Sequence, residues 1–124
     1  LEEAVELPFK LVQIKLINLF AEAVIQRLAV GNHYHTEESG RYEFYVVHCE
    51  GSQEPGGLLE PACLFRFRKA GEGEIQEIRM MAGDACLIPP GNSHAFLPLR
   101  AGVQILGLSN LEYDSGHDVT DKLF

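Results

Sequence analysis

The residues best suited to chemistry are two histidines in one short segment. His33 and His35 flank Tyr34. On a β-strand, residues i and i+2 point to the same face, so the two imidazoles would lie on one side, about 6–7 Å apart. Both rings could then reach a single ion, because a metal–nitrogen bond is only about 2.0–2.1 Å long. The pair alone does not predict a site, since a histidine on a strand is more often hydrogen-bonded or exposed.

A carboxylate and a third histidine make a metal site the favoured interpretation. Glu43 begins the next apolar segment, and a hairpin around Ser39 and Gly40 would return it to the histidine pair. His94 follows a Pro-Pro-Gly sequence at 89–91, which predicts a tight turn before a strand. Three histidines and one carboxylate suit zinc, iron, manganese, nickel or copper. We therefore predict one divalent metal ion on His33, His35, Glu43 and His94.

The elements that position these residues are predicted to be strands. Short apolar runs, several with alternating polarity, are separated by glycine, proline and polar turn residues. A helix over 16–28 is the alternative to the second run. Many short strands without helices predict an all-β sandwich or barrel. The predicted strands cover residues 10–16, 22–30, 42–49, 63–68, 74–80, 84–89, 94–99 and 103–109.

The length and charge of the chain limit its organisation and its partners. With 124 residues, 46% of them hydrophobic, the chain can form one core. We predict a single domain over 1–124, with a core at about 9–110 and a polar tail at about 111–124. The net charge of −8 and the scattered lysines and arginines argue against nucleic-acid binding. An exposed edge strand over 9–19 would favour pairing, so we expect a homodimer.

Other features favour a cytoplasmic protein without a membrane segment. No apolar run approaches the roughly 18 residues that span a bilayer. The first six residues are acidic where a signal peptide would be basic. The three cysteines are odd in number and form no C-x-x-C pair, so we expect buried thiols rather than disulfides. Because the first residue is Leu1 and not methionine, we expect further residues upstream.

The two histidine-containing segments resemble the two sequence motifs of the cupin superfamily. The first motif is a glycine, H-x-H, a glutamate and a glycine, matched here by Gly31, His33, His35, Glu43 and Gly51. The second is a glycine, five residues, Pro-x-Gly, two residues and a histidine, matched here by Gly83, Pro89, Gly91 and His94. The resemblance implies a double-stranded β-helix, or jelly-roll, barrel with the metal inside. It also implies that the ligands are His33, His35, Glu43 and His94.

The spacing in the first motif departs from the family pattern. Seven residues separate His35 from Glu43, whereas three or four are usual. Glu38 or Glu37 therefore stays an alternative ligand. We favour Glu43, because it opens a run of strand-forming residues while Glu37 and Glu38 lie in the predicted turn.

Five further residues are weaker candidates for the site. Tyr45 and Phe96 lie on the inward side of their predicted strands, where they could line the cavity or belong to the ordinary core. Arg27 occupies an alternate position of its predicted strand that points inward, so it could bind an anion. His48 faces the other side of its strand and His117 lies in the polar tail, so neither is predicted as a ligand.

Three functions are compatible with the resemblance. The sequences at 31–35 and 44–47 are similar to cupins of nucleotide-sugar and polysaccharide biosynthesis, which implies a sugar isomerase or epimerase. Some members of that group work without metal, and here His33 or His35, together with Tyr45, would be the catalytic acid and base. The alternatives are an Fe-dependent dioxygenase acting on a small acid, and a non-catalytic cupin. In each case a small molecule would bind inside the barrel.

Overall fold

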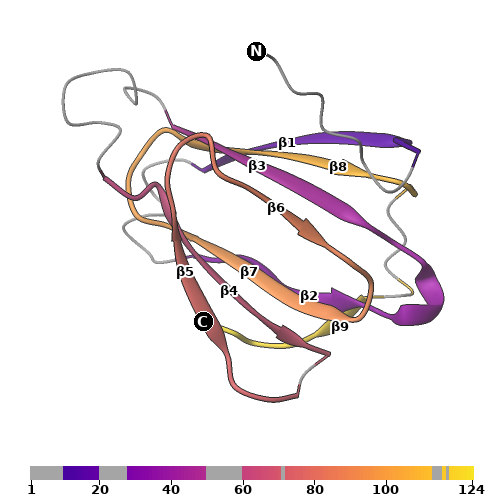
Figure 1. The fold of residues 1–124 in the computed structure, drawn as a ribbon. Helices are drawn as coiled ribbons and strands as arrows, with labels where there is room; N and C mark the ends of the chain where they lie inside the picture. The colour runs from indigo at the N-terminus through magenta and orange to yellow at the C-terminus, as the bar shows by residue number, and fades with distance from the viewer. Residues whose placement is uncertain (1–9, 20–27, 50–59, 71, 113–115, 117) are drawn as a thin grey trace, which may run out of the picture.

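The computed structural model describes residues 10–19, 28–49, 60–70, 72–112, 116 and 118–124, which form two facing antiparallel sheets (Figure 1). The first sheet has the strand order β1 (Gln13–Leu19), β8 (Val103–Ser109), β3 (Glu43–Cys49) and β6 (Ala85–Ile88). The second has the order β5 (Gln76–Met80), β4 (Cys63–Lys69), β7 (Asn92–Pro98), β2 (Val30–His35) and β9 (Asp118–Thr120). The predicted all-β jelly roll is confirmed, as a two-layer sandwich whose described strands do not close into a barrel.

Most strands lie close to their predicted positions. The run predicted over 22–30 falls largely outside the described residues, and only Val30 belongs to a described strand, β2. The alternative helix over 16–28 is wrong for residues 16–19, which are extended in β1, and its remainder is largely outside the described residues. β1 lies at an edge of the first sheet, while the homodimer stays a prediction. In the described part of the chain, no helix has the length and hydropathy needed to cross a membrane.

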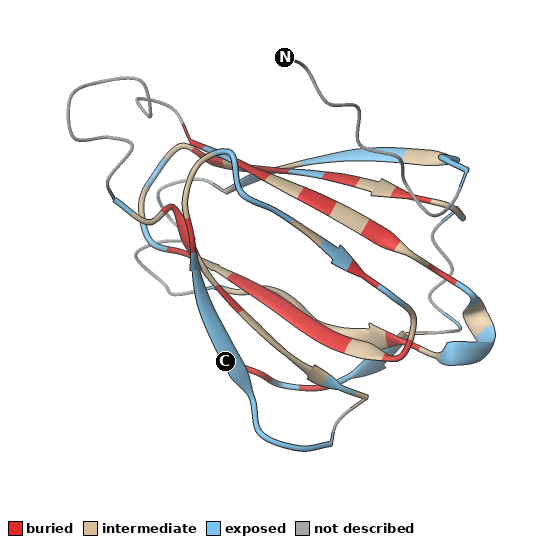
Figure 2. Ribbon diagram, in the orientation of Figure 1, coloured by how far each residue is buried: buried red, intermediate tan, exposed pale blue. Residues whose placement is uncertain are grey.

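Alternation along the strands separates the core from the outer faces (Figure 2). In β3, Glu43 and Cys49 are buried whereas His48 is exposed, as expected for side chains that point to opposite faces. The inner faces meet in one apolar cluster, in which each fully buried large side chain contributes about 1.5–3 kcal/mol. The three cysteines are free thiols; Cys49 and Cys63 are buried, as predicted, whereas Cys86 is only partly buried. The cluster includes Tyr45, Val47, Cys49, Cys63, Phe65, Met80, Phe96, Val103 and Ile105.

The connection between β2 and β3 carries the chain from one sheet to the other. It contains the single-turn helix η1 (Glu37–Ser39) and then Gly40, whose left-handed conformation ends the turn. The predicted hairpin around Ser39 and Gly40 is therefore wrong, because β2 and β3 belong to different sheets. Glu43 instead faces the histidine pair from the opposite layer, across the interior of the sandwich.

A β-bulge in β2 turns the histidine pair toward the interior. Val30 pairs with Phe96 of β7 and packs on the core. If the strand continued regularly, Asn32 would share this inward direction, because side chains alternate with a period of two. The register shifts between Gly31 and His33, so that His33 pairs with His94. The extra residue thus places both histidines of the H-x-H segment inside.

Replacing Gly31 by alanine should destabilise the protein more than the same change at Gly40. A Cβ at Gly31 would lie 2.6 Å from the backbone oxygen of His94, and the φ of 104° is unfavourable for alanine. A Cβ at Gly40 would meet nothing within 4 Å, so only its φ of 64° costs free energy, about 1 kcal/mol. We expect urea denaturation to give a loss of about 3 kcal/mol for Gly31→Ala. Equal losses in the two variants would contradict this close approach of the strands.

The C-terminal segment contains a strand, so the tail predicted at 111–124 is wrong for its last part. β9 pairs with β2 at the edge of the second sheet. Leu123 is buried, and its backbone N–H donates to Asn32 Oδ1 at 2.9 Å. Arg68 donates to both carboxylate oxygens of Asp121, at 2.9 and 2.5 Å. The bulge in β2 therefore also anchors the end of the chain beside the histidines.

Candidate metal centre

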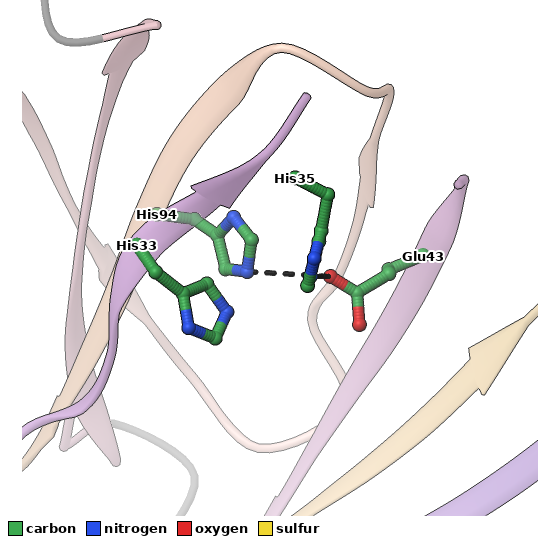
Figure 3. Close-up of side chains that lie close together, drawn as sticks. All are labelled: His33, His35, Glu43 and His94. Carbon is green, nitrogen blue, oxygen red and sulfur yellow. Dashed lines mark ion pairs between the residues drawn. The ribbon is translucent and has the colours of Figure 1, made fainter. Parts of the chain in front are cut away.

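Four side chains from three strands converge between the two sheets (Figure 3). His33 and His35 come from β2, His94 from β7 and Glu43 from β3. One possible ligand atom of each residue lies within 4.8 Å of those of the other three. The ring centroid of His33 is 4.8 Å from that of His35 and 4.9 Å from that of His94. The structure therefore brings together all four residues that were predicted as ligands.

Three of the converging atoms are buried and have no hydrogen-bond partner among the described residues. They are His35 Nε2, His94 Nε2 and Glu43 Oε1. The carboxylate oxygen lies 2.8 Å from the first nitrogen and 3.3 Å from the second, but neither contact has hydrogen-bond geometry. A buried polar atom without a partner costs about 1–3 kcal/mol. Two imidazole nitrogens and a carboxylate oxygen in this arrangement fit a divalent cation, with His33 as a further donor.

His33 is the most exposed member of this cluster. Its side chain is 27% exposed, compared with 4% for His35 and 3% for His94. Burial and the positive charges that His94 and His35 can carry lower the pKa of His33 to about 4. The imidazole is therefore neutral at pH 7, which is the state that binds a metal or accepts a proton.

The Glu43 carboxyl is ionised although it is buried. Burial alone would raise its pKa, but the close contacts with His35 and His94 outweigh this and hold the pKa well below its usual range. The second oxygen, Oε2, accepts a hydrogen bond from the Tyr45 hydroxyl at 2.7 Å, and the Arg41 guanidinium lies 3.5 Å away. These two partners leave Oε1 to face the imidazoles.

Arg41 and Tyr45 support Glu43 from the side away from the histidines. Arg41 is buried and is itself held by the backbone oxygen of Leu111 at 2.9 Å and by Gln13 Oε1 at 3.3 Å. Burial and the neighbouring carboxylate raise the pKa of Tyr45 above its usual range, so its hydroxyl stays protonated. Tyr45 was predicted from its strand parity, whereas Arg41 precedes the strand and has no pattern that indicates an inward direction.

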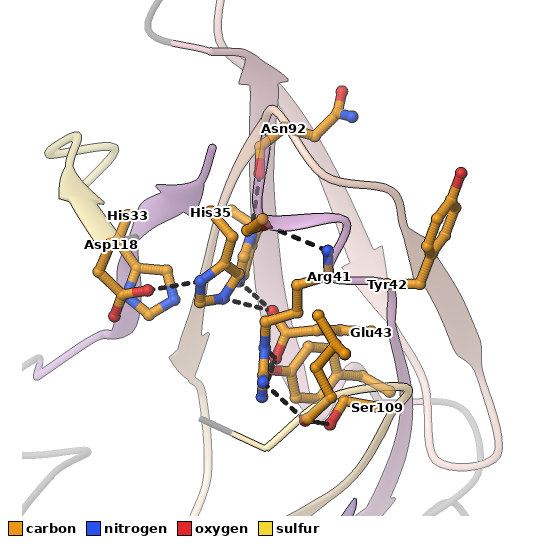
Figure 4. A network of polar contacts seen from close by, with 12 residues as sticks. His33, His35, Arg41, Tyr42, Glu43, Asn92, Ser109 and Asp118 are labelled. Atoms are coloured by element: carbon orange, nitrogen blue, oxygen red, sulfur yellow. Dashed lines mark hydrogen bonds and ion pairs between the residues drawn. The ribbon is translucent and has the colours of Figure 1, made fainter. Parts of the chain in front are cut away.

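Asp118 is a site residue that the sequence did not reveal. Its Oδ1 lies 2.5 Å from His35 Nδ1, and its Oδ2 lies 3.8 Å from His33 Nδ1 (Figure 4). A carboxylate on the outer ring nitrogen directs the opposite nitrogen toward a metal and fixes the ring orientation. His94 has an equivalent contact, since its Nδ1 lies 3.0 Å from the backbone oxygen of Asn92. Both fully buried histidines are therefore held through Nδ1, with Nε2 pointing into the cluster.

The remaining candidates from the sequence lie elsewhere. Glu37 and Glu38 are exposed in η1 and do not belong to the four-residue cluster, so of these three glutamates Glu43 is the one that the fold brings to the histidines. Phe96 is buried in the core, 5.2 Å from the ring of Tyr45. Arg27 and His117 fall outside the described residues.

Among the described residues, openings border the cluster both on the side of β6 and on the side of β1. We define the interior mouth as the larger opening, of about 330 Å³, which borders His94 and is otherwise largely apolar. The smaller, the β1–β2 crevice, measures about 30 Å³ and is lined by His33, Tyr45, His94 and Lys15 among others. Lys15 faces inward from the edge strand β1, which supplies a cationic group beside the most exposed histidine. The sequence did not indicate this lysine at the site.

Comparison with known proteins finds likeness in structure but not in sequence. No protein-family model and no curated protein matches the chain. The QdtA 3,4-ketoisomerase from Thermoanaerobacterium thermosaccharolyticum is 17% identical, with a TM-score of 0.66 over 91% of this chain and 68% of that one. WlaRA, a TDP-fucose-3,4-ketoisomerase from Campylobacter jejuni, is also 17% identical, with a TM-score of 0.65 over 92% and 70%.

A larger protein contains a similar unit. The capsular polysaccharide assembling protein CapF from Staphylococcus aureus is 16% identical and has a TM-score of 0.59 over 89% of this chain but only 26% of CapF. At these identities, of 16–17%, the likeness establishes the fold. The chain thus has the fold of these cupin-type proteins, which supports the likeness to cupins expected from its two motifs.

Proposed function

We propose that this chain is a metal-dependent cupin enzyme of the isomerase or epimerase type, acting beside the carbonyl group of a sugar. The observation that carries the proposal is the convergence of His35 Nε2, His94 Nε2 and Glu43 Oε1, buried and without hydrogen-bond partners among the described residues. A divalent ion held by these atoms and by His33 would supply a Lewis acid for a carbonyl oxygen. Strands from both layers present the ligands, which favours a rigid site.

The side chains around the cluster suit proton transfer next to a carbonyl. Such an isomerisation removes a proton from the carbon that bears a hydroxyl group and, through an enediolate, returns a proton to the former carbonyl carbon; the hydroxyl proton moves to the former carbonyl oxygen. His33 is neutral at pH 7 and borders the β1–β2 crevice, so it can accept a proton when it is not a ligand. His35 is less available, because Asp118 holds its Nδ1. Tyr45 keeps its proton and acts as a hydrogen-bond donor rather than a base.

The substrate class is inferred from the crevice and from the structural likeness. Lys15 lines the β1–β2 crevice and also a small pocket beside Arg41 and Glu43, so a cationic side chain is available to an anionic substrate. QdtA and WlaRA, which are described as 3,4-ketoisomerases, favour a nucleotide-linked keto sugar. Both observations support the isomerase over the non-catalytic binder.

Elemental analysis of the protein, purified without added metal, tests the proposed site. We expect about one equivalent of a divalent metal per chain, and less than about a tenth of an equivalent in a His33→Ala, His94→Ala double variant. Circular dichroism of both proteins checks that the variant is folded. Zinc, nickel or manganese would be consistent with the isomerase.

Other outcomes would redirect the proposal. A parent protein that holds no metal, and binds none when Zn²⁺, Mn²⁺, Ni²⁺ or Fe²⁺ is added, would overturn the metal site. It would favour metal-free acid and base chemistry by His33, His35 and Tyr45. Equal metal contents in the parent and the folded double variant would place the ion elsewhere on the chain.

An Fe-dependent dioxygenase is the second candidate, and the interior mouth is the observation that favours it. Three histidines and one glutamate suit iron as well as zinc. The mouth borders His94 and offers a largely apolar wall, which suits a small acid with an apolar body better than a sugar. Iron in the purified protein, together with oxygen consumption on addition of a substrate, would select this reading.

A further inference from the structure

The interior mouth is lined by residues of β6, an edge strand of the first sheet, and of β4, β5 and β7 in the second sheet. Among the described residues, its lining contains no lysine, arginine, aspartate or glutamate. The side-chain amide of Asn92 donates hydrogen bonds to the backbone oxygens of Pro89 and Pro90, at 3.2 and 3.3 Å. The apolar wall of the interior mouth includes Phe65, Phe67, Ile78, Leu87 and Ile88.

An inward-facing apolar side chain is left open to solvent at this mouth. Ile78 pairs with Phe65, whose side chain is buried, and so points to the same inner face. Ile78 is nevertheless 45% exposed, whereas Met80, the next inward residue of β5, is buried. β6 covers only part of the second sheet, since it is four residues long. In the described part of the chain, core-facing apolar surface is therefore open to solvent at the interior mouth, which His94 also lines.

The aromatic rings of β4 give this wall a flat surface. Phe65 and Phe67 are stacked, with ring centroids 5.3 Å apart and planes inclined by 20°. Phe65 continues the stack toward Phe96, at 4.7 Å. A flat ring or a branched alkyl group would pack on such a surface and remove apolar area from water, which favours binding.

We propose that the interior mouth binds an uncharged, compact apolar group of one or two rings. The volume of about 330 Å³ is roughly twice that of an apolar cavity that holds benzene. A charged group would lose its hydration there without meeting an opposite charge. Because His94 both lines the mouth and belongs to the cluster, a ligand held in the mouth lies next to the reacting centre. That this apolar group is part of a substrate rests on the proposed function, whereas its binding in the interior mouth does not.

The uncharged fluorophore 6-propionyl-2-dimethylaminonaphthalene tests the proposal, because its emission shifts to the blue in apolar surroundings. We expect one molecule to bind per chain. Ile78→Glu, which puts a carboxylate at the mouth, should weaken binding at least 10-fold. Leu106→Glu is the matched control: Leu106 is similarly exposed, at 36%, but lies on the outer face of the first sheet. It should leave the affinity unchanged.

Competition and chelation complete the test. Uncharged 2-naphthol should displace the fluorophore, and 2-naphthalenesulfonate should be at least 10-fold weaker. Protein treated with EDTA should bind the fluorophore as the untreated protein does, so a failure of the metal site would leave this result intact. Unchanged binding by Ile78→Glu, an equal loss in Leu106→Glu, or equal displacement by the sulfonate would each overturn the proposal.

Discussion

Replacing Glu43 by glutamine should raise the dissociation constant for Zn²⁺ at least 100-fold. Glutamine keeps the size of the side chain but removes the negative charge and leaves an amide, which is a poor ligand for zinc. The carboxylate oxygen Oε1 is the atom that both His35 Nε2 and His94 Nε2 approach, so its loss removes the centre of the ligand set. Competition with a chromophoric zinc chelator measures the constant.

Glu38→Gln is the control for this experiment. The spacing from His35 to Glu38 is closer to the cupin pattern than the spacing from His35 to Glu43. Glu38 is nevertheless exposed in η1 and lies outside the cluster. Its substitution should leave zinc binding within about twofold of the parent. A large loss with Glu38→Gln and none with Glu43→Gln would mean that the helical turn rearranges to supply the ligand.

The same Glu43 variant should also destabilise the metal-free protein. Arg41 is buried against Glu43, and a buried guanidinium that loses its carboxylate costs about 3–5 kcal/mol. Urea denaturation of EDTA-treated protein measures this loss apart from metal binding. Because the pKa of Glu43 is held low in the folded state, its contribution is complete above the unfolded pKa of about 4.3 and declines as the pH falls below that value. The difference between parent and variant should therefore shrink in acid.

The strands were predictable where the local pattern and the fold agree. The alternation at 42–49, 63–68 and 103–109 records an inner and an outer face, and β3, β4 and β8 lie there. The assignment of strands to sheets was not predictable from neighbouring residues. The turn at Ser39 and Gly40 suits a hairpin, yet here it joins two layers, because β2 pairs with β7 and β9. Such pairings depend on residues distant in the sequence.

The site residues that were predicted have a local sequence pattern, whereas those that were missed depend on contacts between residues distant in the sequence. His33 and His35 were found through their spacing, although the bulge at Asn32, and not regular alternation from Val30, turns them inward. Asp118 belongs to a three-residue strand with one apolar residue, too short for a periodic signal. Its carboxylate reaches His35 only because β9 pairs with β2, a contact between residues more than eighty positions apart. Local patterns therefore found the candidate ligands but not the carboxylate that contacts one of them.

Asp118→Asn tests whether this orientation matters, and we expect it to raise the dissociation constant for Zn²⁺ by about 10- to 100-fold. The carboxylate oxygen 2.5 Å from His35 Nδ1 favours the tautomer that leaves Nε2 free to bind a cation. An amide oxygen at this position would contact His35 Nδ1 without the negative charge, so the ring would be held less firmly. Asp118 acts through His35 and is a positioning residue. The visible spectrum of the Co²⁺-loaded protein should therefore change in the variant, which a merely structural role would not cause.

Asp121→Asn distinguishes the orientation of the His35 ring by Asp118 from the packing of the C-terminal segment against the second sheet. Asp121 follows the same strand and pairs with Arg68, and this contact holds the pKa of the Asp121 carboxyl below its usual range. Its substitution should loosen the chain end and lower the free energy of unfolding slightly, with zinc affinity nearly unchanged. If both variants lost affinity equally, β9 would act only by covering the site. If Asp118→Asn bound zinc and Co²⁺ as the parent does, His35 would be oriented by the sandwich alone, without help from the last strand.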